Sequence, residues 1–242
     1  MKIIWVLILI LSVMECENSG VQRFEDNPYI NYQSFQSNNG TNIYFIVVMP
    51  ENYTADSTYP VLITFPPGSQ SKELAEGALE AYWITSSIKT GWIVISPISP
   101  NDTLYFEGAE KYVPELMAWI KNQFKVEGNK FHFAGSSNGG LSAFRIALDH
   151  TQDVQSLTVL PGYPPGPNDY GILDRLKYIP INMYVGEYDK TFRSPMESTY
   201  NKLREIKAWR VSLEIRAGEG HVLQKLTSAE LLAVLETTRP EH

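Results

Sequence analysis

The sequence contains a single cysteine, Cys16, in 242 residues. An internal disulfide and a cysteine-based zinc site are therefore excluded, and the body of the chain has no thiol to act as a nucleophile. Basic residues are also scarce, because 20 Lys and Arg face 27 Asp and Glu, for a formal net charge of −7. This balance disfavours nucleic acid or an anionic membrane as the main partner. The apolar content of 43% is ordinary for a globular domain and excludes a disordered chain.

Long apolar runs are missing except at the extreme N-terminus, where residues 3–14 are almost entirely apolar. This run is shorter than the roughly 20 residues that a membrane-spanning helix needs, so no transmembrane anchor is expected. It follows a lysine and precedes a polar stretch, which predicts a signal peptide over residues 1–16 and a secreted protein. Lipid attachment at Cys16 is the alternative, although Glu15 fits it poorly.

The rest of the chain divides into a polar segment and one domain. Residues 17–40 are rich in Asn, Gln and Ser, and we interpret them as a leader to a domain over residues 41–242. Apolar runs predict strands at 42–49, 60–65, 91–96, 130–134, 156–160, 179–185 and 211–215. Helical spacing or flanking patterns predict helices at 71–88, 110–124, 141–148, 195–206 and 227–235.

This alternation predicts an α/β fold with a mainly parallel central sheet and helices on both faces. Residues 161–178, between two expected strands, have room for one short helix, so we expect no separate lid domain. In such sheets, functional sites form at the carboxyl ends of the strands. The loops that follow the strands are therefore the place to look for chemistry.

The run GSSNG at residues 135–139 lies between an expected strand and an expected helix. The pattern G-x-S-x-G in this context is typical of a nucleophile elbow, a strained turn that exposes its serine above the sheet. A side chain at Gly135 or Gly139 would clash with neighbouring elements. Ser137 is therefore the candidate nucleophile.

A serine hydroxyl needs a base, usually a histidine that a carboxylate orients. Of the four histidines, His221 alone lies in a loop after an expected strand near the end of the chain. The others lie in a strand, at a helix end and at the last position: His132, His150 and His242. The acid is expected after a strand between Ser137 and His221, where we favour Asp189 and keep Glu187 as the alternative. The order Ser137, Asp189, His221 is that of the α/β hydrolases.

These motifs make the chain resemble the α/β-hydrolase superfamily, and within it the esterase D, feruloyl esterase and polyhydroxybutyrate depolymerase group. The resemblance covers residue 42 to the C-terminus and rests on the runs GSSNGG, VGEYD, GEGH and YPVLITFPPGSQS. It implies an α/β-hydrolase fold and a serine hydrolase that cleaves carboxylic esters through an acyl-enzyme intermediate. Neither a metal nor a cofactor is implied, and the expected substrate is a small-molecule or polysaccharide-linked ester.

The resemblance also implies an oxyanion hole made by two backbone amides. One belongs to Asn138, the residue after the nucleophile, and the other to the loop after Phe65. In that loop Pro66-Pro67 replaces the usual His-Gly, and proline has no N–H to donate. The donor must then be Gly68 or Ser69, and we favour Gly68.

Substrate contacts and substrate class are less determined by the sequence. Four aromatic residues near expected strand ends are candidates either for a substrate-binding wall or for plain core packing: Trp83, Tyr105, Phe106 and Tyr163. Two other functions stay open. The same triad serves serine peptidases of the prolyl oligopeptidase type, and the Pro66-Pro67 departure is compatible with a non-catalytic binding protein on the same scaffold.

Overall fold

The computed structural model describes residues 24–240. The predicted signal peptide over residues 1–16, including Cys16, lies outside the described residues. Among the helices of residues 24–240, none combines the length and the apolarity that crossing a membrane requires.

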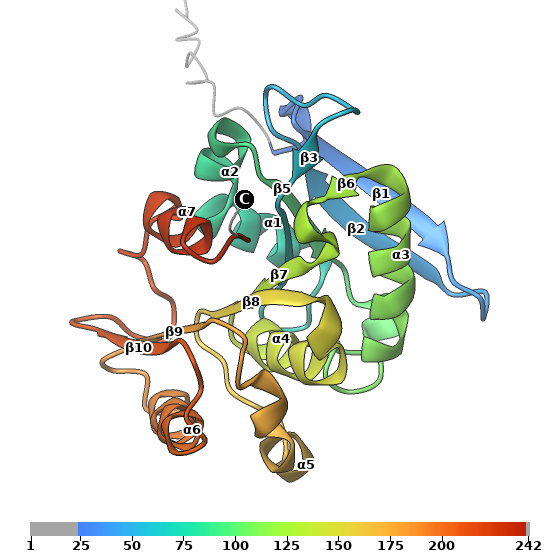
Figure 1. Cartoon of the computed structure of the whole chain (residues 1–242). Helices are drawn as coiled ribbons and strands as arrows, with labels where there is room; N and C mark the ends of the chain where they lie inside the picture. The colour runs from blue at the N-terminus through green and yellow to red at the C-terminus, as the bar shows by residue number, and fades with distance from the viewer. Residues whose placement is uncertain (1–23, 241–242) are drawn as a thin grey trace, which may run out of the picture.

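Within the described part of the chain, eight strands form one sheet in the order β1-β2-β5-β4-β7-β8-β9-β10 (Figure 1). The strands are β1 (Ile30–Gln36), β2 (Asn42–Val48), β4 (Val61–Phe65), β5 (Ile93–Pro97), β7 (Phe131–Gly135), β8 (Val154–Val159), β9 (Ile181–Gly186) and β10 (Val211–Arg216). The pairs β1–β2 and β2–β5 are antiparallel and the other neighbours are parallel. The prediction of a mainly parallel sheet is confirmed. The two short strands β3 (Thr58–Tyr59) and β6 (Lys125–Val126) pair separately.

Helices cover both faces of this sheet, as predicted. The longer ones are α1 (Lys72–Tyr82), α2 (Ile84–Thr90), α3 (Val113–Gln123), α4 (Asn138–Asp149), α6 (Arg193–Glu205) and α7 (Ser228–Glu236). The single helix expected at 71–88 is divided at Trp83 into α1 and α2. The segment between β8 and β9 holds α5 (Pro167–Gly171) and a short 3-10 helix, so it contains no lid domain.

An apolar layer lies on each face of the sheet, between the strands and the helices. Two layers form because successive side chains of a strand point to opposite faces. On β4, Leu62 packs into the layer of α1, α2 and α7, whereas its neighbour Ile63 packs into the layer of α3, α4 and α6. Figure 1 shows these two helix groups on opposite sides of the sheet. Continuous apolar strands are the consequence, since both side-chain directions are buried.

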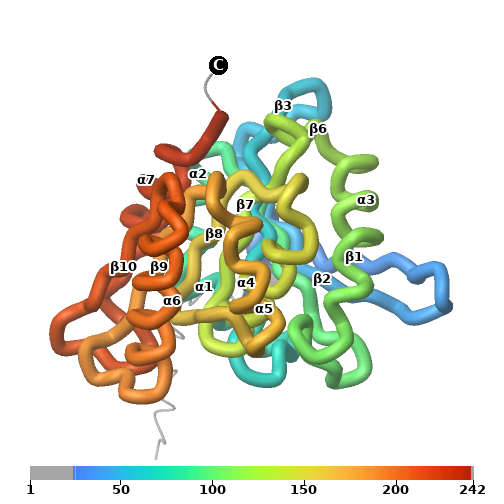
Figure 2. The backbone as a smooth tube through the Cα atoms, turned by 60° about the horizontal axis from the view of Figure 1, so that its bottom comes forward, coloured from blue at the N-terminus to red at the C-terminus, as the bar shows by residue number. Residues whose placement is uncertain are grey.

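The interpretation of residues 17–40 as a leader outside the domain is wrong for its later part. Ile30–Gln36 forms β1, which pairs antiparallel with β2 over its whole length. β1 is an edge strand whose residues are mostly exposed, so a polar composition costs it little. In Figure 2 the β1–β2 hairpin lies at one end of the sheet and β10 at the other.

The strand order reverses at β4, which places the site. From β4 the chain passes through α1 and α2 to β5 on one side, and then through α3 to β7 on the other side. The loops after β4 and β7 therefore diverge and leave a crevice at their carboxyl ends, which is the usual place for a ligand in an open α/β sheet. Gly68 follows β4 and Ser137 follows β7.

His132 is a buried histidine of β7 that makes stability depend on pH. Burial, and after it the charge of Arg239, lower the pKa of His132 to about 3, while its Nδ1 lies 2.8 Å from Ser156 Oγ. Below about pH 6.5 the unfolded chain binds a proton there that the folded chain does not. The free energy of unfolding should therefore fall by up to about 1.4 kcal/mol per pH unit as the pH decreases toward 3.

Denaturant unfolding of the wild type and of His132→Asn at about pH 7.0 and at about pH 5.5 tests this effect. The amide of Asn cannot titrate there, so the variant should lose less stability between the two pH values, by about 1.3 kcal/mol. Equal losses in the two proteins would contradict the prediction. The comparison cancels the titration of the other groups.

Candidate active site

Ser137 lies in a strained turn between β7 and α4. Its backbone has φ 57° and ψ −121°, a conformation that non-glycine residues rarely adopt. The two flanking glycines are required by close backbone approach, because a Cβ at Gly135 would lie 2.1 Å from Gly139 O and a Cβ at Gly139 would lie 1.9 Å from Phe65 O. The Ser137 N–H donates to Pro161 O at 2.8 Å. These constraints hold the side chain above the sheet, as the elbow pattern predicts.

Three of the predicted residues form a continuous hydrogen-bond chain. His221 Nε2 lies 2.8 Å from Ser137 Oγ, and His221 Nδ1 lies 2.7 Å from Asp189 Oδ2. An ionised carboxylate can only accept, so Nδ1 carries the proton and Nε2 is free to accept from the serine hydroxyl. The structure thus brings together Ser137, His221 and Asp189 from loops after three different strands, β7, β10 and β9.

The carboxylate of Asp189 is buried and fixed, with its side chain 3% exposed. Its second oxygen, Oδ1, accepts from the backbone N–H groups of Thr191 at 3.2 Å and Phe192 at 3.1 Å. The Phe192 ring packs on the imidazole of His221, with centroids 4.8 Å apart. Both contacts restrict the plane of the imidazole and hold Nε2 toward Ser137.

Glu187, the alternative acid, lies elsewhere. Its Oε2 accepts from the N–H of Gly218 at 2.8 Å, so it supports the loop that carries His221 rather than the imidazole itself. The same loop passes so close to β9 that a Cβ at Gly186 would lie 2.0 Å from Gly220 O. The geometry therefore favours Asp189 as the orienting acid.

The two predicted oxyanion donors lie in the loop after β4 and at the start of α4. Asn138 begins α4, and its side-chain Nδ2 donates to Gly68 O at 2.9 Å. Within residues 24–240, neither the Gly68 N–H nor the Asn138 N–H has a hydrogen-bond acceptor. Unpaired amides next to a nucleophile, at the positive end of a helix, suit a developing negative charge.

A buried side chain holds the Gly68 loop in place. Gln70 is fully buried, its Nε2 donates to Ser142 Oγ at 2.8 Å, and its Oε1 accepts from Tyr105 N at 2.9 Å. Gly68 itself has φ +57°, a left-handed conformation that glycine adopts without strain. Gln70 thus fixes the segment that follows the two prolines. Sequence reasoning missed Gln70, since a lone polar residue in a loop carries no pattern.

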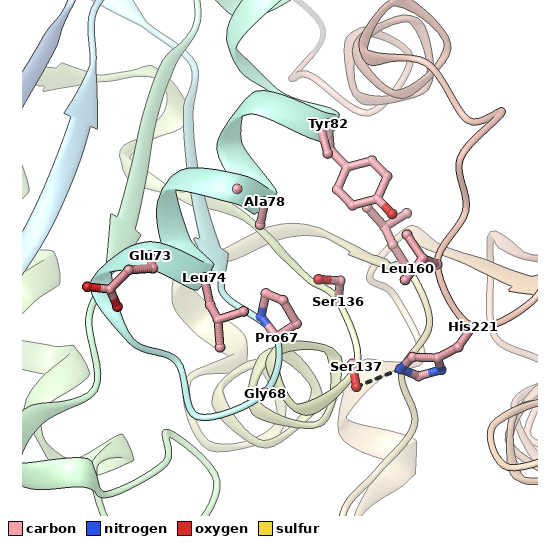
Figure 3. A pocket seen from close by; sticks show the side chains of 13 residues that line it. Pro67, Gly68, Glu73, Leu74, Ala78, Tyr82, Ser136, Ser137, Leu160 and His221 are labelled. Atoms are coloured by element: carbon pink, nitrogen blue, oxygen red, sulfur yellow. Dashed lines mark hydrogen bonds between the residues drawn. The ribbon is translucent and has the colours of Figure 1, made fainter. Parts of the chain in front are cut away.

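A cleft of about 440 Å³ opens beside Ser137 and His221 (Figure 3). One wall is α1 and the other is formed by Leu160 and the His221 loop. The lining residues are mostly apolar or small: Pro67, Gly68, Glu73, Leu74, Gly77, Ala78, Ala81, Tyr82, Ser136, Ser137, Leu160, His221 and Val222. An apolar cleft with a few convergent polar groups is the usual form of a small-molecule site.

The predicted aromatic wall is not part of this cleft. Trp83 and Tyr105 are 1% and 0% exposed and belong to the two apolar layers. Phe106 and Tyr163 are half-buried against the core, and Tyr163 packs on Phe192 rather than on the cleft. Tyr82 lines the cleft instead. Tyr82 is itself buried in the same layer as Trp83, and it reaches the cleft from the last turn of α1.

Comparison with solved structures finds similar folds at low sequence identity. A thermostable esterase is 17% identical, with a TM-score of 0.67 over 78% of this chain and 55% of its own. An S-formylglutathione hydrolase from Agrobacterium tumefaciens is 15% identical, with a TM-score of 0.67 over 86% of this chain and 94% of its own. A mutant feruloyl esterase module from Clostridium thermocellum, complexed with sinapinate, is 11% identical, with a TM-score of 0.62 over 80% and 82% of the two chains.

The share of each match that this chain covers differs. The chain spans about half the length of the thermostable esterase (55%) and nearly all of the S-formylglutathione hydrolase (94%). Neither a protein-family model nor a curated protein matches the sequence significantly. The likeness therefore concerns the arrangement of the strands and helices.

Proposed function

We propose that this chain, which has the α/β-hydrolase fold, is a secreted serine hydrolase that cleaves carboxylic esters. The observation that carries the proposal is the hydrogen-bond chain from Ser137 Oγ through His221 to Asp189, at the edge of an apolar cleft. The secreted location rests on the N-terminal sequence alone. The substrate class is a small-molecule ester or an ester linked to a polysaccharide.

In the proposed mechanism, Ser137 Oγ attacks the ester carbonyl carbon while His221 Nε2 takes the hydroxyl proton. The carbonyl oxygen becomes an oxyanion, which the amides of Gly68 and Asn138 stabilise. The carbon–oxygen bond to the alcohol then breaks, and His221 gives its proton to the leaving oxygen. Water, deprotonated by the same imidazole, attacks the acyl-serine and releases the acid and a free Ser137. Asp189 holds the imidazole and stabilises its charged form throughout.

The lining of the cleft supports an ester rather than a peptide. A bound peptide presents N–H and C=O groups that need polar partners, whereas the walls of this cleft are α1 side chains, Leu160 and Val222. The unpaired amides of Gly68 and Asn138 support catalysis over a purely binding role. A binding protein has no use for a base aligned on a serine.

Labelling with a fluorophosphonate probe tests the proposal, because the probe phosphonylates only an activated serine. We expect the folded wild type to be labelled and Ser137→Ala to lose all labelling. Ser198→Ala, at an exposed serine of α6, is the matched control and should label like the wild type. Absence of labelling in the folded wild type would reject the proposed function.

A substrate comparison separates the ester hydrolase from the peptidase. The purified wild type should hydrolyse p-nitrophenyl esters and leave peptide p-nitroanilides intact at equal concentration. Faster cleavage of the anilides would assign the same triad to peptide hydrolysis.

A further inference from the structure

One wall of the cleft is a face of α1 that carries small residues between Leu74 and Tyr82. Gly77, Ala78 and Ala81 of α1 lie on this face, since residues three and four positions apart are neighbours on a helix surface. Leu74 lies at one end of the face and Tyr82 at the other. At 1.5 Å per residue, the groove is about 12 Å long.

The groove offers contacts to an uncharged apolar group. Leu74, Ala78, Ala81 and Leu160 present only hydrocarbon. Burial raises the pKa of the Tyr82 phenol, which keeps it neutral. Glu73 is the one carboxylate along the described lining, and its own backbone N–H and the Ser71 hydroxyl lower its pKa. Its negative charge disfavours an anionic substrate group at the mouth of the groove.

The position of the groove relative to His221 indicates which half of the ester it takes. His221 Nε2 must reach the leaving oxygen to protonate it, so the alcohol lies on the histidine side of Ser137. Figure 3 shows Leu74 beyond Pro67, on the side of Ser137 opposite His221, whereas Tyr82 lies above Leu160 on the His221 side. A group that extends from Ser137 toward Leu74 therefore belongs to the acyl half.

We propose that the groove formed by Leu74, Gly77, Ala78 and Ala81 binds the acyl chain of the substrate, so that esters of medium-chain fatty acids are preferred over acetyl esters. This inference rests on the proposed ester hydrolase. Gly77 is the residue that determines specificity, because an ideal Cβ there has no atom within 4 Å and any side chain would occupy the groove instead.

A chain-length series measures the preference. The wild type is assayed with p-nitrophenyl acetate, butyrate, octanoate and laurate below their solubility limits. Each methylene that leaves water raises kcat/KM by about fourfold at most, so octanoate should exceed acetate by at least about tenfold, mainly through KM. A rate that falls steadily from acetate to octanoate would overturn the inference.

A pair of matched substitutions tests the groove itself. Gly77→Leu fills it, and Gly171→Leu places the same side chain on α5, where a Cβ also has no atom within 4 Å. We expect the octanoate-to-acetate ratio of kcat/KM to fall at least about tenfold in Gly77→Leu and to equal the wild-type ratio in Gly171→Leu. A wild-type ratio in Gly77→Leu would overturn the assignment of the groove.

Two further measurements separate the possible failures. Acetate esters of ethanol, butanol and octanol vary the alcohol alone, and a Gly77→Leu effect confined to this series would place the alcohol in the groove and overturn the acyl assignment. Fluorophosphonate labelling reports on the proposed function independently. A labelled enzyme that prefers acetate overturns the groove only, whereas an unlabelled, inactive wild type overturns the ester hydrolase.

Discussion

Replacement of Asp189 by Asn should lower kcat by about 10⁴-fold without unfolding the protein. The Asn side chain keeps an oxygen for the Thr191 and Phe192 amides, so the local backbone is preserved. Its NH₂ group, however, faces His221 Nδ1 and favours the tautomer with the proton on Nε2. That imidazole cannot accept the Ser137 proton. Steady-state kinetics with one p-nitrophenyl ester measures the loss, and circular dichroism checks the fold.

Glu187→Gln is the matched control for this substitution. It removes the same charge two residues away and keeps an oxygen for the Gly218 N–H, so kcat should stay within about tenfold of the wild type. A large loss in Glu187→Gln together with a small loss in Asp189→Asn would exchange the two roles. The measured pair therefore decides between the two acids that the sequence alone leaves open.

The second large effect is expected on folding, from Gly139→Ala. The added methyl would lie 1.9 Å from Phe65 O and 2.5 Å from Pro66 O, and both are backbone atoms of the central sheet and the loop after it. This steric clash can be relieved only if α4 moves away from β4. We expect a loss of at least about 4 kcal/mol in the free energy of unfolding, or no folded protein at all.

Denaturant unfolding with Gly77→Ala as control measures this effect. The same methyl group on α1 meets no atom within 4 Å, and alanine in a helix interior is about 1 kcal/mol more favourable than glycine. The control should therefore be as stable as the wild type or more stable. A Gly139→Ala variant with a wild-type midpoint would show that the elbow has more room than the structure gives it.

The sequence predicted well those strands whose burial leaves a clear mark on their composition. Strands such as β4 and β5 are buried on both faces and are therefore almost continuously apolar. β1 was missed because an edge strand with exposed residues has the composition of a loop. The helix after the elbow begins at Asn138 rather than near 141, since its first turn consists of small residues that show no apolar period.

The candidate site divides in the same way. Ser137, Asp189 and His221 could be found because a parallel sheet brings the ends of its strands to one edge, so position along the chain predicts position in space. The residues that form the walls of the cleft could not be found in this way. Tyr82 and Trp83 are adjacent in the sequence and both are buried, but only the packing of α1 decides that Tyr82 also lines the cleft.

The loops that carry the proposed acid Asp189 and the proposed base His221 follow the last two strands of the sheet, β9 and β10. β10 pairs only with β9, and its residues are half-buried or exposed, whereas β7 is fully buried between two neighbours. Protection against local opening follows burial and pairing. The proposed nucleophile Ser137 therefore follows a well-protected strand, whereas the proposed base His221 follows a weakly protected one. Fraying of a single peripheral strand would abolish the proposed hydrolase activity while the core stays folded, so this activity would report on the β10 edge more sensitively than a global probe of folding.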